Sequence, residues 1–326
     1  MSVMVTGAAG FIGFHVTTAL LARGETVIGV DNLSDYYDVA LKEARLACFE
    51  GEKDFIFRRL DIADKDAMAA LVAEFSDMDR VIHLAAQAGV RYSLINPYAY
   101  IHANVSGQLV VMEAFRTIKN LRHLVYASSS SVYGGNTKLP FSVDDRVDNP
   151  VSLYAATKKS VELLAASYAH LYRLPMTGLR FFTVYGPWGR PDMAAFIFAQ
   201  KILAGEEISV FNNGDMKRDF TYIDDIVAGV LACLDMPPAD QGGTSPHRIY
   251  NLGNHRAEPL MRFIGLIEEA LGQKAKVKME PMQPGDVKET YADIDSSRRD
   301  FGFKPTTTID QGLPRFIAWH KNYHGA

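Results

Sequence analysis

Short apolar runs alternate with amphipathic stretches over the first half of the chain. The longer segments carry apolar residues at helical spacing, and between them lie runs rich in Val, Ile, Leu and Phe. Strands separated by helices of this length are typical of βαβ units, so the pattern predicts an α/β fold with a doubly wound parallel sheet. The expected strands cover residues 3–5, 26–30, 55–57, 80–84, 121–127 and 176–182, and the expected helices 14–22, 64–75, 97–117 and 151–170.

The alternation becomes irregular after residue 183. A Pro/Gly-rich loop is expected over 236–247, and the strand signals around 206–221 and 249–252 are short. This part of the chain predicts a smaller lobe that covers the cleft of the main sheet. Its expected helices cover residues 193–204, 222–235, 259–271 and 309–322.

A glycine-rich turn follows the first strand. Gly7, Gly10 and Gly13 stand between that strand and the first helix, and Asp31 ends the second strand. Glycines there permit a tight turn and let the backbone approach a pyrophosphate, while an acidic residue after the second strand binds the adenosine ribose and repels a 2′-phosphate. The pattern predicts a Rossmann-type domain that binds NAD rather than NADP.

Polar and small residues follow the other strands of the predicted sheet. Asp61, Ala85–Ala86 and the serine run 128–131 each come directly after a strand. Ligands of such sheets bind outside the carboxyl ends of the strands. We therefore expect these residues to meet Gly7–Gly13 and Asp31 at one edge.

Tyr154 and Lys158 lie four residues apart in the expected helix 151–170 and therefore share a face. A tyrosine acts as a base near pH 7 only if its pKa falls by about three units, roughly 4 kcal/mol, and a nearby lysine and a cationic cofactor ring can provide this. The pair predicts transfer of a hydroxyl proton. The alternative is an ordinary surface tyrosine and lysine.

Composition limits the classes of partner. The chain has 326 residues, 48% of them hydrophobic and 22% charged, with a net charge of −4. This charge favours neither nucleic acid nor an anionic membrane as a partner. Cys48 and Cys233 have no partner spacing and are expected to be packing residues in helices, and His83 has no metal-ligand spacing, so no metal site is predicted. Without a signal peptide or an 18-residue apolar stretch, a cytoplasmic location is expected.

These motifs together resemble the extended short-chain dehydrogenase/reductase family, and in particular its nucleotide-sugar epimerases and dehydratases. The resemblance covers the whole chain. Longer stretches resemble the UDP-glucuronate 4-epimerases of that family; they are residues 31–38, 41–46, 180–192, 214–225 and 282–286.

The resemblance implies an NAD-dependent isomerase that converts UDP-glucuronate to UDP-galacturonate, a precursor for polysaccharide biosynthesis. Tyr154 would remove the proton of the sugar 4-hydroxyl as hydride passes from C4 to tightly bound NAD⁺. The 4-keto sugar would turn over in the pocket, and hydride would return to its other face. Lys158 would hold the nicotinamide ribose and lower the pKa of Tyr154, and Ser129 would bond the 4-oxygen.

The resemblance also assigns the binding residues and the domains. Residues 1–180 with 222–252 would form the NAD-binding domain, and 181–221 with 253–326 the UDP-sugar-binding domain. Helices 97–117 and 151–170 would form the interface of a homodimer. The cofactor residues would be Gly7, Gly10, Phe11, Ile12, Gly13, Asp31, Asn32, Asp61, Ile62, Leu84, Ala85, Ala86, Asn104, Ser128, Tyr154, Lys158 and Phe182. The substrate residues would be Gln87, Arg91, Ser129, Ser130, Ser131, Thr183, Arg190, Phe211, Arg218 and Asp286.

Three other functions are compatible with much of this pattern. A UDP-glucose or UDP-N-acetylglucosamine 4-epimerase would not need Arg190, and a UDP-glucuronate decarboxylase would carry a glutamate at the position of Ser131. Ser130 and Ser131 are neutral, and with Thr183 and Arg190 they are expected to hold a sugar carboxylate in a polar environment that disfavours loss of CO₂. A nucleotide-sensing regulator on the same fold would not need the Tyr154/Lys158 pair.

Overall fold

The structure is a computed structural model that describes residues 2–283 and 286–325. Its centre is a seven-stranded sheet in the order β11-β6-β5-β4-β1-β2-β3, and every neighbouring pair is parallel. The predicted fold class is therefore confirmed. The strands are β1 (Ser2–Thr6), β2 (Thr26–Asp31), β3 (Phe55–Arg59), β4 (Arg80–His83), β5 (His123–Ser129), β6 (Met176–Phe181) and β11 (His247–Leu252).

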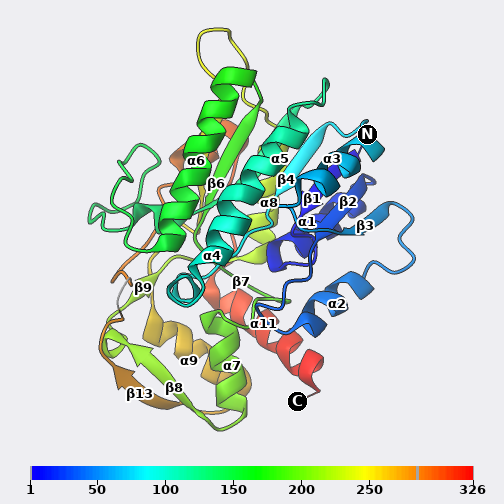
Figure 1. Cartoon of the computed structure of the whole chain (residues 1–326). Helices are drawn as coiled ribbons and strands as arrows, with labels where there is room; N and C mark the ends of the chain where they lie inside the picture. The colour runs from blue at the N-terminus through cyan, green and yellow to red at the C-terminus, as the bar shows by residue number, and fades with distance from the viewer. Residues whose placement is uncertain (1, 284–285, 326) are drawn as a thin grey trace.

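Helices cover both faces of the sheet (Figure 1). Side chains alternate along each strand, so Val3 and Val5 of β1 enter the core beneath one set of helices and Met4 enters the other core. One face packs on α1 (Phe11–Ala22) and α8 (Ile223–Leu234). The opposite face packs on α3 (Lys65–Glu74), α5 (Gly107–Phe115) and α6 (Leu153–Tyr172).

The helix predicted over 97–117 is interrupted. It consists of α4 (Pro97–Tyr100), a π-helical turn η2 (Ile101–Ser106) and α5. Single π-turns inside helices often lie at functional sites, because they redirect a side chain. Here the turn carries Asn104 and aims it into the protein interior, where it is 2% exposed.

The smaller lobe lies beyond the carboxyl edge of the sheet, at the bottom of Figure 1. Its hydrophobic core is continuous with the α1 and α8 face of the main sheet. A strand, β13 (Lys276–Glu280), and a helix, α10 (Asp295–Phe301), were not predicted, and the domain boundaries expected from the sequence stay a prediction. Three two-stranded sheets pair β10 with β7, β12 with β9 and β13 with β8. The strands are β7 (Thr183–Tyr185), β8 (Glu207–Phe211), β9 (Lys217–Arg218), β10 (Phe220–Tyr222), β12 (Glu258–Pro259) and β13 (Lys276–Glu280). The helices beside these sheets or near the C-terminus are α7 (Ala194–Leu203), α9 (Leu260–Leu271), α10 (Asp295–Phe301) and α11 (Ile309–His324).

Cys48 was predicted to be a packing residue, but it does not pack in the core. Helix α2 (Val39–Ala47) ends one residue earlier, and Cys48 is exposed at its C-terminal cap, whereas Cys233 is buried in α8. Within the described ranges, every helix is too short or too polar to cross a membrane.

Candidate active site

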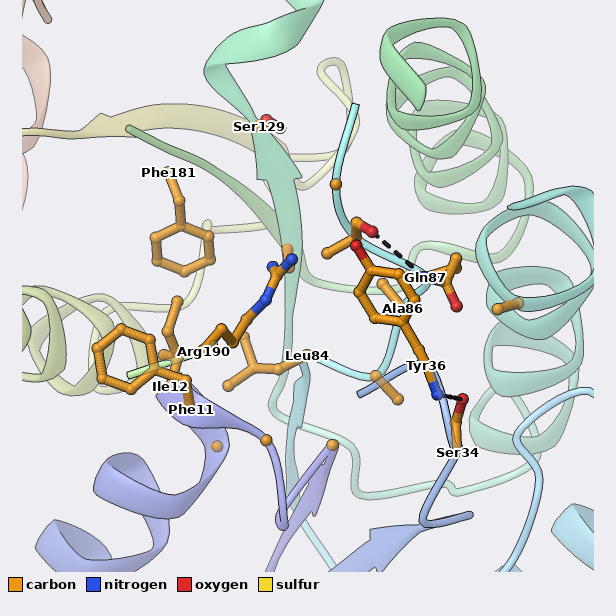
Figure 2. A pocket seen from close by; sticks show the side chains of 18 of the residues that line it. Phe11, Ile12, Ser34, Tyr36, Leu84, Ala86, Gln87, Ser129, Phe181 and Arg190 are labelled. Atoms are coloured by element: carbon orange, nitrogen blue, oxygen red, sulfur yellow. Dashed lines mark hydrogen bonds between the residues drawn. The ribbon is translucent and has the colours of Figure 1, made fainter. Parts of the chain in front are cut away.

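A cavity of about 510 Å³ opens at the carboxyl ends of the parallel strands (Figure 2). It is formed by the turns that follow these strands and by the start of the smaller lobe, as the sequence predicted. The predicted residues that line it are Gly7, Gly10, Phe11, Ile12, Gly13, Asp31, Asn32, Asp61, Ile62, Leu84, Ala85, Ala86, Gln87, Ser128, Ser129, Ser130, Ser131, Tyr154, Lys158, Phe182, Thr183 and Arg190.

The glycine turn cannot accommodate side chains. Gly7 has a positive φ of 75°, and a Cβ on Gly13 would lie 1.9 Å from the carbonyl oxygen of Gly7. The turn therefore brings bare backbone and the amino end of α1 to the cavity wall, where amide groups can bind a pyrophosphate. This geometry fits the NAD predicted from the sequence.

Asp31 and Asp61 border the same end of the cavity. Asp31 accepts hydrogen bonds from the amides of Ala9 (3.2 Å) and Leu33 (2.9 Å), and this ties the glycine turn to the end of β2. Lys42 also lines the cavity near Asp31, and burial lowers the pKa of its amine. The sequence reasoning missed Lys42 because it lies on α2, away from any strand end.

The predicted catalytic residues lie together where β5 ends and α6 begins. Lys158 is 4% exposed, and its amine donates to the carbonyl oxygen of Ala127 at 2.8 Å. Burial lowers the pKa of Lys158 to about 8, against the opposing influence of the Glu162 carboxylate. The lysine therefore carries its charge at neutral pH but holds it weakly.

The predicted lowering of the Tyr154 pKa relied on Lys158 together with a cationic cofactor ring, and the groups of the chain by themselves do not produce it. Burial raises this pKa, and the Ser129 hydroxyl and the Arg190 charge only partly oppose this effect. Lys158 does not oppose the effect of burial, because its amine donates to the Ala127 carbonyl and not to the phenol. The groups of the chain itself thus keep Tyr154 protonated at neutral pH.

A buried ion pair lies behind the serine run. Arg180 donates to both carboxylate oxygens of Glu162, at 2.7 and 2.9 Å, and Ser128 donates to the same carboxylate at 2.7 Å. Glu162 and Arg180 are each 2% exposed. The pair joins β6 to α6, and the Ser128 bond fixes the end of β5 against the same helix; β5 and α6 carry Ser129 and Tyr154.

Arg45 connects the cofactor side of the cavity to the loop that carries Arg190. Its guanidinium is fully buried and donates to the carbonyl oxygens of Ala9 (2.8 Å), Trp188 (2.6 Å) and Gly189 (3.3 Å). A planar group with five donors suits this task, because several acceptors can be bonded in one plane. The glycine turn and the loop before Arg190 are thus held by one side chain.

Asn104 was predicted to be a cofactor residue, but it is not among the residues that line the cavity. Its amide nitrogen donates to the carbonyl oxygen of Gln87 (3.0 Å) and the hydroxyl of Thr157 (3.1 Å), and its oxygen accepts from the Gln87 amide (2.8 Å). It fixes the loop that carries Gln87 and the first turns of α6.

The residues predicted to hold the nucleotide of the substrate lie outside this cavity. The Arg91 guanidinium stands over the Phe211 ring at 5.0 Å and lies 4.0 Å from the Asp286 carboxylate. Arg218 donates to the carbonyl oxygens of Lys217 and Lys288, and Asp286 is close enough to act on its pKa. These four residues form a separate group beside the cavity mouth.

Comparison with known proteins agrees with this geometry. The family model described as "NAD dependent epimerase/dehydratase family" matches residues 3–253. A protein of Arabidopsis thaliana named UDP-glucuronate 4-epimerase 2 is 48% identical over 99% of this chain and 76% of its own length. A probable UDP-glucuronate 4-epimerase of Rhizobium meliloti (strain 1021) is 45% identical over 100% of this chain and 99% of its own.

The solved structures include a similar protein with bound ligands. The crystal structure of UDP-glucuronic acid 4-epimerase from Bacillus cereus, in complex with UDP-glucuronic acid and NAD, is 33% identical and superposes with a TM-score of 0.91. The match covers 99% of this chain and 100% of that one. The whole chain therefore has the architecture of a protein that binds both molecules.

Proposed function

Because the chain belongs to the NAD-dependent epimerase/dehydratase family, we propose that it is an isomerase that interconverts UDP-glucuronate and UDP-galacturonate. The observation that carries the proposal is that Tyr154 and Arg190 line one cavity. A phenol there can exchange a proton with a sugar hydroxyl, and a guanidinium can bind a sugar carboxylate. The reaction is inversion at carbon 4.

Tyr154 takes the proton of the 4-hydroxyl and later returns it, and Ser129 donates a hydrogen bond to the same oxygen. When bound, NAD⁺ supplies the reversible acceptance of hydride from carbon 4. The backbone of Gly7–Gly13 would hold the cofactor, and with NAD⁺ bound the charges of Lys158 and of the nicotinamide ring would together favour the phenolate of Tyr154. Each of these residues lines the same cavity, so the proton can leave the 4-hydroxyl oxygen while the hydride leaves carbon 4 of the same sugar.

The same cavity favours retention of the carboxylate. A 4-keto uronic acid loses CO₂ most readily when its carboxylate is stripped of hydrogen bonds. Ser130, Ser131, Thr183 and Arg190 all line the cavity and offer donors to that group. The outcome is epimerisation without decarboxylation.

The group beside the cavity mouth holds the nucleotide. Phe211 offers a ring face to the uracil, Asp286 accepts hydrogen bonds from the ribose, and Arg218 and Arg91 face the diphosphate. The cation–π contact of Arg91 with Phe211 places a positive charge where a diphosphate would pass. Binding of UDP would then replace the contacts that Arg91 makes with Phe211 and Asp286.

The proposal is tested by incubating the protein with UDP-glucuronate and NAD⁺ and following the sugar by proton NMR. UDP-galacturonate is the expected product, and Tyr154→Phe should abolish its formation while NAD⁺ still binds. Formation of UDP-xylose would indicate decarboxylation. Turnover of UDP-glucose alone would refute the role of Arg190 while leaving that of Tyr154 intact.

An apolar face on α5 and α6 supports a homodimer. Leu109 of α5 is 40% exposed, and Leu163 and Leu171 of α6 are 59% and 64% exposed. A second copy would bury these side chains between two pairs of helices. Leu163→Glu should then yield a monomer in light scattering coupled to gel filtration, and an unchanged mass would contradict the dimer. A cytoplasmic location stays a prediction.

A further inference from the structure

Arg190 is not free in the cavity. It is 20% exposed and forms two hydrogen bonds with Asp192, one from Nε to Oδ1 at 3.0 Å and one from Nη2 to Oδ2 at 2.5 Å. The hydroxyl of Tyr36 donates to the same Oδ2 atom at 2.9 Å. Figure 2 shows the Arg190 and Tyr36 side chains reaching toward one another across the cavity. The sequence reasoning did not connect these three residues.

The two bonds to Asp192 use one edge of the guanidinium. An arginine has five N–H groups, and the edge formed by Nε and one Nη nitrogen can bind one carboxylate with two hydrogen bonds. Asp192 takes that edge, which leaves three N–H groups. Two of these, one on each Nη nitrogen, form a second edge that can bind another carboxylate. Arg190 can therefore bind a sugar carboxylate without losing Asp192.

Asp192 is itself held in place by Tyr36. The Tyr36 ring packs on the Tyr92 ring with centroids 4.7 Å apart. A Cβ on Gly89 would lie 2.8 Å from the Tyr36 hydroxyl, so the backbone presses closely on this oxygen. Burial and the Asp192 charge raise the pKa of Tyr36 to about 12. Tyr36 therefore remains a hydrogen-bond donor over the working pH range.

The carboxylate of Asp192 also limits the charge that Arg190 brings to the cavity. The charges of Arg190 and Asp192 act on Tyr154 in opposite directions. A bound carboxylate thus meets a guanidinium that is oriented and partly neutralised. Such a group discriminates through the geometry of its donors more than through charge alone.

We propose that Asp192 and Tyr36 are positioning residues that hold Arg190 by one edge, so that its other edge selects substrates with a sugar carboxylate. The inference rests on the proposed function, because it assigns the sugar carboxylate to Arg190. It adds that selection depends on two side chains that need not touch the sugar. One of them, Tyr36, lies 156 positions from Asp192 along the chain.

The test measures discrimination between two substrates. UDP-glucuronate and UDP-glucose are titrated by calorimetry into the NAD⁺-loaded protein, and kcat and KM for UDP-glucuronate are measured in parallel. Asp192→Asn should weaken UDP-glucuronate binding about tenfold, and Tyr36→Phe about threefold, because a misaligned edge loses a charge-assisted hydrogen bond. UDP-glucose binding should change less than about twofold, since it has no carboxylate to align.

The chain contains a matched control. On the surface, Tyr250 donates to Oδ2 of Asp300 at 2.8 Å, and Arg299 binds both oxygens of Asp300, at 2.7 and 3.3 Å. Asp300→Asn and Tyr250→Phe therefore remove the same kinds of bond outside the cavity. Neither should alter the ratio of the two affinities. Melting temperatures of all four variants show whether each has folded.

Three results would overturn the proposal. Equal losses for both sugars would mean that Asp192 and Tyr36 only support the local structure, and unchanged affinities would mean that they do not align Arg190. Tighter binding of UDP-glucuronate by Asp192→Asn would mean that Asp192 occupies the edge the substrate needs. Failure of the proposed function would look different, because the unmodified protein would then not prefer UDP-glucuronate. If Asp192→Asn does not fold, Tyr36→Phe decides alone.

Discussion

Replacing the proposed catalytic lysine should make the protein more stable at neutral pH. Lys158 is 4% exposed, and burial lowers its pKa from an ordinary 10.5 to about 8. At pH 7 the amine is charged in both the folded and the unfolded state, so the folded state bears the cost of burying that charge. Lys158→Met removes the cost together with the activity.

The magnitude follows from the pKa difference. Each unit of pKa difference between the two states corresponds to about 1.4 kcal/mol, so lowering the pKa of Lys158 from 10.5 to about 8 corresponds to about 3 kcal/mol at pH 7. The methionine no longer donates to the Ala127 carbonyl, which costs about 1 kcal/mol. The free energy of unfolding of Lys158→Met should therefore exceed that of the original protein by about 2 kcal/mol.

The sign of the pH dependence distinguishes this explanation from better packing. Between pH 8 and 10.5 the unfolded chain holds the Lys158 proton and the folded chain has released it, so the original protein gains stability as the pH rises. The advantage of Lys158→Met should shrink steadily above pH 8 and vanish near about pH 10.

Urea unfolding of nucleotide-free protein between pH 7 and 10 measures both quantities. Lys276 is the matched control, because its exposed amine also donates to a backbone carbonyl at 2.8 Å, that of Gly205. Lys276→Met should show no gain at any pH. A Lys158→Met protein that is less stable at pH 7, or whose advantage is the same at every pH, would refute the reasoning.

Three further predictions concern the core and the glycines. Glu162→Gln should lower the free energy of unfolding by about 3–5 kcal/mol, because Arg180 stays buried without its partner. The double variant Glu162→Leu/Arg180→Met should lose less, and an equal loss in urea unfolding would contradict this. Gly13→Ala should abolish NAD⁺ binding in a fluorescence titration, since its Cβ would meet the Gly7 carbonyl at 1.9 Å; unchanged affinity would show that the turn can open. Gly265→Ala in α9, where no atom lies within 4 Å of the new Cβ, should raise the free energy of unfolding by up to about 1 kcal/mol, and a decrease would point to a hidden contact.

The local signals in the sequence were sufficient for the main sheet and for the part of the cavity wall that directly follows its strands. Strand–helix alternation and the glycine turn depend on residues near one another in the chain, so periodicity and turn chemistry identify them. Tyr154 and Lys158 share a helix face for the same reason. These features follow from spacing alone.

Features that depend on contacts between residues far apart in the chain could not be predicted from the sequence. Asn104 looked like a cavity residue, but a π-helical turn aims it at Gln87 and Thr157, which lie 17 and 53 positions away. The Tyr36 hydroxyl meets Asp192 only because the fold brings the loop before α2 and the loop before α7 together. Short-range spacing carries no signal for such encounters, and the same holds for the pairing of β13 with β8.

The buried bonds of Arg45 restrict how this protein can be re-engineered. Its guanidinium joins the turn at Ala9 to the loop at Trp188 and Gly189, so the segment proposed to meet the cofactor and the segment proposed to meet the sugar share one anchor. If residues 186–192 alone were replaced by the corresponding loop of another epimerase, Arg45 would still be positioned to bond the carbonyl oxygens of the original loop. Successful chimaeras should exchange residues 31–47 together with that loop. With the two segments in their proposed roles, cofactor recognition and sugar recognition are not independent modules in this chain.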